Sequence, residues 1–270
     1  MIGISAVPDT VVRDRLWAWG NEQGAWADGW RLPARSRMSG AEAAMYLGLP
    51  NGLMVGHNGK PAPPLDQYAI AYRPLKRVMW SIVHSGGATD ASYTDHVLDV
   101  AARFPNFTGV FLDDFFVRTE GTSFRSSLSL DDLAAMRGRL KLPDRTLELW
   151  AVHYTHQFDL PVGEYVALCD KLTFWTWDSG KLRDLDANLD LLDSLYPDLR
   201  KVQGVYLWDF HNKYEVPLEG MRHQCETGLR WLKEGRIDGM IFIGSILLDI
   251  GLQSADWLRA WIAEVGDELL

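Results

Sequence analysis

Three aspartates of this chain stand among large apolar residues, where a charge is costly. Asp113 and Asp114 lie together in the run GVFLDDFF, and Asp178 follows the run FWTW. Apolar neighbours raise the pKa of a carboxyl group, and such a group is seldom placed there unless it is paired or needed. A protonated carboxyl and an ionised one in the same pocket can serve as a general acid and as a nucleophile or base. We therefore predict that Asp113, Asp114 and Asp178 are catalytic.

Further side chains that could bind a substrate stand at or near the ends of short β-branched or aromatic runs. Strand ends are often polar only because they are exposed, which accounts for Ser85 and Asn58. Exposure accounts less well for WTWD and LWDFH, where each carboxylate is embedded among aromatic residues. The predicted substrate-binding residues are His57, His84, His153, Tyr154, Trp177, Trp208, Asp209 and His211.

Eight apolar runs alternate with amphipathic stretches along the chain, which is the pattern of repeated βα units. The predicted strands are residues 15–20, 52–57, 77–84, 108–115, 146–154, 171–178, 202–210 and 239–245. Predicted helix starts lie at Ser39 and Ser129, each followed by an acid three residues later, and at Thr94 and Ser254. An open doubly wound sheet would carry a glycine-rich phosphate turn after its first strand, and WGNEQGAW is not one. The sequence predicts an α/β fold, a single (β/α)₈ barrel that forms one catalytic domain over residues 1–270.

In such a barrel, functional residues sit at the C-terminal ends of the strands. Side chains alternate along a strand, so Phe111 and Asp113 share one face while Leu112 and Asp114 share the other. We expect Asp113 to point toward the barrel axis. Asp114 is expected to point toward the surrounding shell or the following loop, where one of the two acids caps the next helix.

Composition limits the partners. The net charge of −9 and a pI of about 5.2 disfavour nucleic acid and anionic membranes. Cys169 and Cys225 fall in predicted helices without metal-ligand spacing, so we expect buried thiols. The start MIGISAVPDTVV lacks the basic and apolar regions of a signal peptide, and a signal already removed would leave no trace. Neither the compartment nor the oligomeric state follows from these features.

The stretch FTGVFLDDFF resembles the fourth-strand motif of TIM-barrel glycoside hydrolases, in particular the chitinase-like and α-galactosidase-like groups. The resemblance implies an enzyme that cleaves a glycosidic bond with two carboxylates and no cofactor. By ordinal position it implies Asp113 or Asp114 as nucleophile or base and Asp178 as proton donor. His84, His153 and Asp209 would then bind sugar hydroxyls, and Trp177 and Trp208 would stack on sugar rings. The paired glutamates of cellulase-like barrels are absent from the corresponding strand ends.

Two other functions fit the same residues. A metal-dependent isomerase or hydrolase could take its ligands from His57, His84, Asp113, His153, Asp178 and Asp209. Against it, the first strand lacks a His-x-His motif, and the strand ends carry few glutamates. A carbohydrate-binding barrel without catalysis would keep the aromatic residues, but it would have no need of the further acids.

Overall fold

Eight parallel strands close into a barrel in a computed structural model that describes residues 10–27 and 29–270. Most of the N-terminal stretch examined above for a signal peptide lies outside these residues. The barrel order is β1 (Leu16–Gly20), β2 (Asn51–Met54), β3 (Arg77–Val83), β4 (Phe107–Leu112), β7 (Glu148–Tyr154), β8 (Lys171–Trp175), β9 (Arg200–Val205) and β12 (Gly239–Ile243), which pairs with β1 again. The predicted (β/α)₈ barrel is therefore confirmed.

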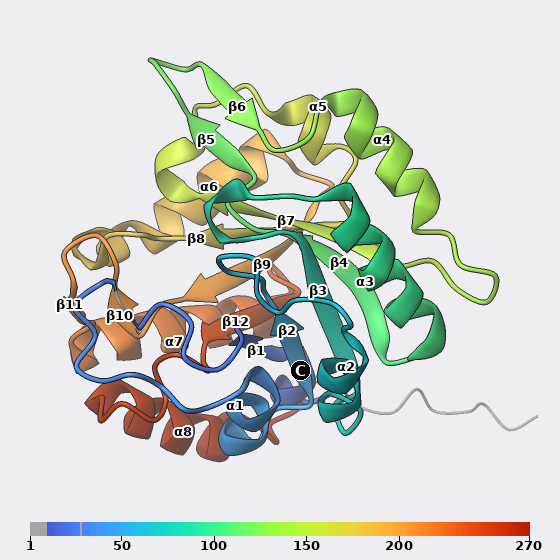
Figure 1. Cartoon of the computed structure of the whole chain (residues 1–270). Helices are drawn as coiled ribbons and strands as arrows, with labels where there is room; N and C mark the ends of the chain where they lie inside the picture. Colours follow the sequence, from blue (N-terminus) through green and yellow to red (C-terminus); the bar gives the residue numbers. More distant parts are fainter. Residues whose placement is uncertain (1–9, 28) are drawn as a thin grey trace, which may run out of the picture.

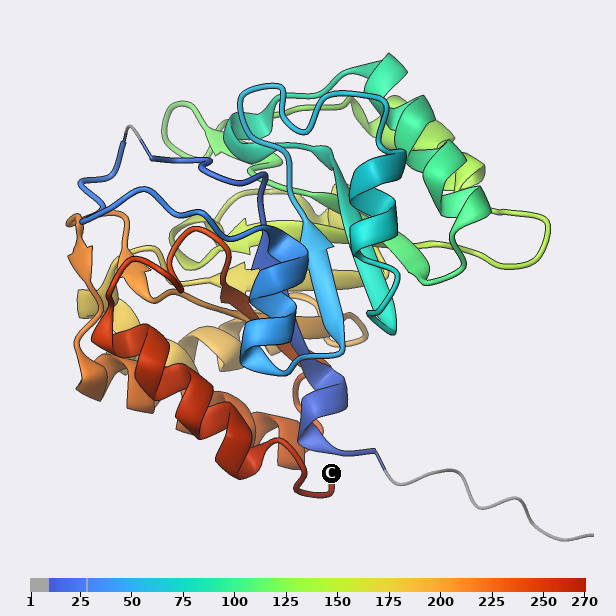
Figure 2. The same cartoon turned by 60° about the horizontal axis from the view of Figure 1, so that its bottom comes forward.

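Helices lie around the outside of the ring of strands, as Figure 1 shows. They are α1 (Gly40–Leu47), α2 (Asp66–Ala71), α3 (Ala91–Arg103), α4 (Leu130–Arg139), α5 (Gly163–Val166), α6 (Leu185–Leu195), α7 (Leu218–Lys233) and α8 (Gln253–Val265). Helices α1 and α8 pack side by side, which is seen best in Figure 2. No helix in the described part of the chain is both long and apolar enough to cross a membrane.

The helix starts differ in how well the sequence located them. Ser39 and Glu42 form the predicted capping box at α1, and the Ser129 side chain accepts a hydrogen bond from the backbone of Asp132 at α4. Helix α3 starts three residues before the predicted Thr94, because Asp90 caps it by accepting from the Ser92 and Tyr93 amides. Both cysteines are buried and free, as predicted, although Cys169 follows the short helix α5 and does not lie within it.

Large aromatic side chains fill the inside of the barrel. Trp17 meets Trp150 edge to face, with ring centroids 5.0 Å apart. One layer further toward the C-terminal ends, Trp19 lies edge to face against Phe111 and Trp175, both at 5.3 Å. This second layer closes the barrel beneath its C-terminal mouth, so that any cavity at the mouth has an apolar floor.

Two short hairpins and one long connection stand over that mouth. The hairpins are β5 (Phe116–Arg118) with β6 (Phe124–Ser126), and β10 (Trp208–Asp209) with β11 (Tyr214–Glu215). The connection is the segment between β1 and α1.

Several predicted strands end earlier than expected. Asp113, Asp178 and Asp209 all lie beyond the last residue of their barrel strand, where the chain turns into the connections.

Gly204 makes room for the aromatic floor. A Cβ atom on Gly204 would lie 1.9 Å from Cδ2 of Trp175, a rigid ring that is itself buried. We expect Gly204→Ala to lower the free energy of unfolding by about 3 kcal/mol or more, at the upper end for overpacked cores. Urea denaturation measures the change.

Gly138→Ala is the matched control for this substitution. Gly138 lies in α4 with no atom within 4 Å of the added Cβ, so the alanine should stabilise the protein by about 0.5–1 kcal/mol through helix propensity. Equal unfolding midpoints for the two variants would contradict this account of the barrel floor.

Candidate active site

Three adjoining cavities open at the C-terminal mouth of the barrel. The inner cavity, of about 380 Å³, lies directly above the aromatic floor and is lined by Trp19, Trp175, Asp113 and Asp114 among others. The outer cavity, of about 740 Å³, lies beside the β5–β6 hairpin. The loop cavity, of about 480 Å³, lies beside the connection between β1 and α1. The inner cavity shares wall residues with each of the others.

Asp113 lies where the alternation of β4 places it, on the same face as Phe111. Its side chain lines the inner cavity, is 3 % exposed and accepts a hydrogen bond from Ser85 Oγ at 2.9 Å. Burial, together with the negative charge of neighbouring Asp114, raises the pKa of Asp113 well above its usual range. Asp113 is therefore a carboxyl group that holds its proton at pH values where most aspartates are ionised.

Asp114 reaches the same cavity by a different route. Its backbone has φ of 46°, in the left-handed region, so the chain turns sharply after Asp113. Its carboxylate accepts hydrogen bonds from Tyr154 Oη and from the Gly86 amide, both at 2.6 Å. Asp114 lines the inner and the outer cavity and caps no helix, so the turn brings both acids into one site.

Two tyrosines complete the polar part of the inner cavity. Burial, with the added effect of the negative charge on Asp114, raises the pKa values of Tyr154 and Tyr206 well above the usual range. Both phenols therefore keep their protons, and that of Tyr154 donates its hydrogen bond to Asp114. Tyr154 was expected from the sequence as a binding residue, whereas Tyr206 was not.

Aromatic rings form most of the inner cavity's remaining wall. Trp177 stacks on Phe210 at 5.7 Å and meets Tyr154 edge to face at the same centroid distance. Trp26 stacks on His57 at 4.8 Å, and burial lowers the pKa of His57. Residues of this wall that sequence reasoning missed are Trp19, Trp26, Trp30, Trp175 and Phe210. Two tryptophans close together in the polar connection after the first strand were the available signal for Trp26 and Trp30.

Asp178 lies at the outer cavity and does not line the inner one. Its Oδ1 atom accepts hydrogen bonds from the Gly180 amide at 2.9 Å and from Asn212 Nδ2 at 3.1 Å, and it caps a 3₁₀ helix at Ser179–Asp184. His211 and Trp177 line the same cavity. The structure thus places Asp178 in the same cavity as Asp114, while Asp113 stands deeper.

Two of the predicted histidines lie outside all three cavities. His153 falls between Val152 and Tyr154, which line the inner cavity, so alternation turns it outward against Phe158. Burial lowers the pKa of His153 to about 4, which leaves a neutral ring whose Nε2 is 3.0 Å from the Gln157 carbonyl. His84 is buried against Tyr93 at 4.5 Å, and burial lowers its pKa as well.

Trp208 and Asp209 support the cavities from behind. The Trp208 indole donates a hydrogen bond to the Trp30 carbonyl at 3.1 Å, which ties the β10–β11 hairpin to the loop after β1. Asp209 is 1 % exposed and accepts hydrogen bonds from Ser179 and Asn212. Burial alone would raise the pKa of Asp209, but these hydrogen bonds outweigh it and lower the pKa. Neither Trp208 nor Asp209 lines any of the three cavities.

The six side chains considered as metal ligands do not meet at one point. Among them, His57 and Asp113 line the inner cavity, Asp178 lines the outer one, and His84, His153 and Asp209 lie outside both. Within residues 10–27 and 29–270, no group of three or more His, Cys, Asp or Glu side chains is arranged to hold a metal ion.

The chain resembles known proteins in its fold and not in its sequence. No family model and no curated protein sequence matches it. Among solved structures, a protein described as an α-L-fucosidase from Bacteroides thetaiotaomicron superposes with a TM-score of 0.60 at 11% identity, over 98% of each chain. The active domain 2 of a thermostable chitinase from Pyrococcus furiosus superposes with a TM-score of 0.56 at 10% identity, over 95% of this chain and 96% of that one. A protein described as a 2-pyrone-4,6-dicarboxylic acid hydrolase from Acinetobacter baumannii superposes with a TM-score of 0.52 at 10% identity, over 93% of this chain and 92% of that one.

At these identities the likeness concerns the fold alone. The structural neighbours include a fucosidase, chitinases and glucuronidases built on TIM barrels, which confirms for the fold the resemblance stated from the sequence. The presence of a hydrolase of a different class among them is in keeping with a fold that hosts many chemistries.

The opposite pKa shifts of Asp113 and Asp209 predict opposite pH dependences of stability. Asp113 has a raised native pKa, so above about pH 4, where the unfolded chain ionises, the native protein loses stability as pH rises. Asp113→Asn removes this loss. The free energy of unfolding of the variant, relative to that of the unsubstituted protein, should therefore increase from pH 4 to pH 8. Urea titrations at a series of pH values measure it.

Asp209→Asn is the contrasting variant. The native carboxylate has a lowered pKa, so its contribution is fully present above about pH 4 and is lost as pH falls through the native pKa. The variant should be less stable by about 1–3 kcal/mol near neutral pH, with a smaller deficit in acid. Two variants with parallel pH profiles would disprove these charge assignments.

Proposed function

We propose that this protein is a glycoside hydrolase whose reaction takes place in the inner cavity. The observation that carries the proposal is the pair Asp113 and Asp114, which line one aromatic cavity in different environments. Asp113 is buried and keeps its proton, whereas Asp114 is held as a hydrogen-bond acceptor by a tyrosine and a backbone amide. Cleavage of a glycosidic bond needs one group of each kind.

The roles follow from these environments. Asp113 donates its proton to the glycosidic oxygen as the bond from that oxygen to the anomeric carbon breaks, and the oxygen keeps the bonding electron pair. The carboxylate of Asp114 stabilises the positive charge that develops on the sugar. Water then adds to the anomeric carbon, and its proton returns to the carboxyl pair. This assignment differs from the expectation from sequence, in which Asp178 was the donor.

The surroundings of the pair suit a sugar. Trp26, Trp30 and Trp177 offer aromatic faces on which the apolar face of a pyranose ring can lie. Tyr154, Tyr206 and Asn58 offer polar groups for hydroxyls. Two structural neighbours are described as a fucosidase and a chitinase, which adds support from barrels of similar shape.

The roles of the acids can be tested by isosteric substitution. Asp113→Asn and Asp114→Asn should each lower kcat by about 10²–10⁴-fold, the usual contribution of a positioned acid or base. Asp178→Asn should have a smaller effect, mainly on KM, because Asp178 lies at the outer cavity. The assay is release of reducing ends from a panel of chito-, cello-, xylo-, manno- and malto-oligosaccharides together with aryl fucosides and glucuronides.

Asp144→Asn is the matched control, since Asp144 is an exposed partner of Arg145 away from the cavities. Full activity in one of Asp113→Asn and Asp114→Asn, with loss in the other and in Asp178→Asn, would restore the assignment made from sequence. Binding of glycans without cleavage of any of them would favour the non-catalytic carbohydrate-binding barrel.

Activity should survive strong chelation. The proton transfers described above need only the two carboxyl groups, with no Lewis acid. Preincubation with EDTA, followed by the same reducing-end assay, should leave the rate unchanged. Loss of activity that zinc or manganese restores would instead support the metal-dependent function.

A further inference from the structure

We propose that the substrate is an oligosaccharide chain that runs through all three cavities, and that the bond cleaved lies in the interior of that chain. This inference rests on the proposed function and adds to it the substrate class and the position of cleavage. It follows from the place of Asp113 and Asp114 in the central one of three connected spaces.

The connections are made by shared walls. Gly86, Asp114, Tyr154 and Trp177 line both the inner and the outer cavity. On the other side, Trp26, Trp30, His57 and Asn58 line both the inner and the loop cavity. Space therefore continues past the acids in two directions. An enzyme that removes single terminal sugars needs a site that ends just beyond its acids.

Each space is large enough for part of a sugar chain. The volumes of about 380, 480 and 740 Å³ all fall in the range of about 300–1,000 Å³ that is usual for a small-molecule site. A single sugar in the inner cavity would leave both of its neighbours unused. A chain of three or more units would occupy all of them.

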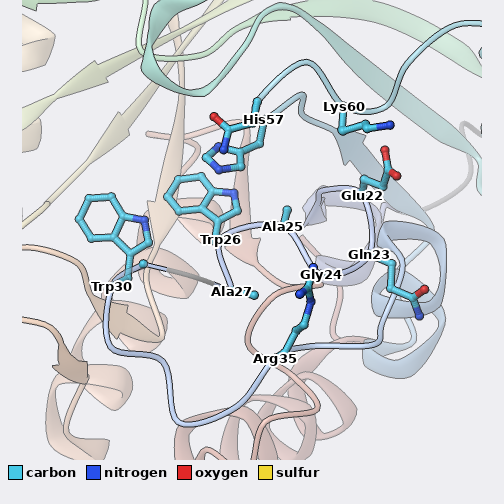
Figure 3. Close-up of a pocket in the computed structure, with 12 residues that line it drawn as sticks. Glu22, Gln23, Gly24, Ala25, Trp26, Ala27, Trp30, Arg35, His57 and Lys60 are labelled. Carbon is cyan, nitrogen blue, oxygen red and sulfur yellow. The ribbon is translucent and has the colours of Figure 1, made fainter.

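The loop cavity has the chemistry of a sugar site. Figure 3 shows the Trp26 ring beside His57, with Trp30 to its left and the side chains of Glu22 and Lys60 to its right. Within the described residues, Trp26 Nε1, His57 Nδ1 and Glu22 Oε2 are buried without a hydrogen-bond partner. Buried polar atoms are nearly always paired, so unpaired ones gathered at one cavity mark a place for a polar ligand.

The backbone around Trp26 supports the same conclusion. Trp26 and Trp30 have φ of 65° and 58°, in the left-handed region that non-glycine residues rarely adopt. Such conformations cost about 1–3 kcal/mol each and tend to persist at ligand sites. The Trp208 indole holds this segment by its hydrogen bond to the Trp30 carbonyl. The loop therefore presents its two rings to the cavities at a cost in conformational energy.

The outer cavity offers a second set of sugar-binding groups. Arg125 comes from β6, and Lys181 comes from the 3₁₀ helix after β8, so donors enter from two separate elements. Arg118 fixes the β5–β6 hairpin by pairing with Asp159 and by donating to the His156 carbonyl at 2.8 Å. His156 in turn stacks on Tyr154, with ring centroids 5.4 Å apart. The outer wall is thus braced against the residue that binds Asp114.

The test uses chain length and the position of cleavage. For whichever oligosaccharide series of the panel is cleaved, kcat/KM should rise by about tenfold or more from the disaccharide to the hexasaccharide, because remote contacts contribute to catalysis. A hexasaccharide labelled at its reducing end should be cut first at a bond inside the chain, so that its first labelled products are longer than one sugar. Trp26→Ala and Lys181→Ala should shift the main cleavage position in opposite directions along the labelled chain.

Trp257→Ala is the matched control, because Trp257 stacks on Trp261 in α8 and lines none of the three cavities. It should leave the fragment pattern unchanged. Release of monosaccharide from one end, equal kcat/KM at all lengths, or cleavage of aryl glycosides alone would overturn this inference and leave the proposed function standing. No cleavage of any glycan would overturn both.

Discussion

The contact of Trp19 with Phe111 and Trp175 inside the barrel determines most of what lies above it. These rings close the barrel just below its C-terminal mouth, with centroid distances of 5.3 Å. They fit because β9 carries Gly204 where any side chain would meet the Trp175 ring. The floor they form is aromatic and buried. A carboxyl group placed directly on it loses hydration, and its protonated form is favoured.

Asp113 and Asp114 show how one turn of backbone can give adjacent residues different environments. Asp113 continues the inward face of β4 and stays buried, with a hydrogen bond from Ser85. Asp114 turns away with a left-handed backbone and meets two donors, Tyr154 and the Gly86 amide. Because the two groups share a cavity, the charge on Asp114 adds to the effect of burial on Asp113. The division of roles proposed for the pair depends on this asymmetry.

The connections over the mouth surround this floor with three adjoining cavities. The loop after β1 brings Trp26 and Trp30, the β5–β6 hairpin brings Arg125, and the loop after β8 brings Asp178 and Lys181. Residues with no direct contact to the cavities hold these pieces together. Asp209 ties Ser179 to Asn212, and Trp208 holds the loop at Trp30. The cavities are thus defined by loops that are fixed from behind.

The sequence by itself determined the barrel, since eight apolar runs at the interval of βα units have few other ways to bury their faces. It also determined the inward direction of Asp113, because alternation along a strand is a local property. The same rule applied to β7 would have turned His153 outward, away from the site. What only the tertiary structure decided lies past the strand ends, where alternation stops. The left-handed turn at Asp114, the buried role of Asp209 and the approach of Trp26 to His57 all depend on contacts between segments far apart in the chain. Such contacts are set by how loops pack on one another, and no local periodicity of the sequence encodes that packing.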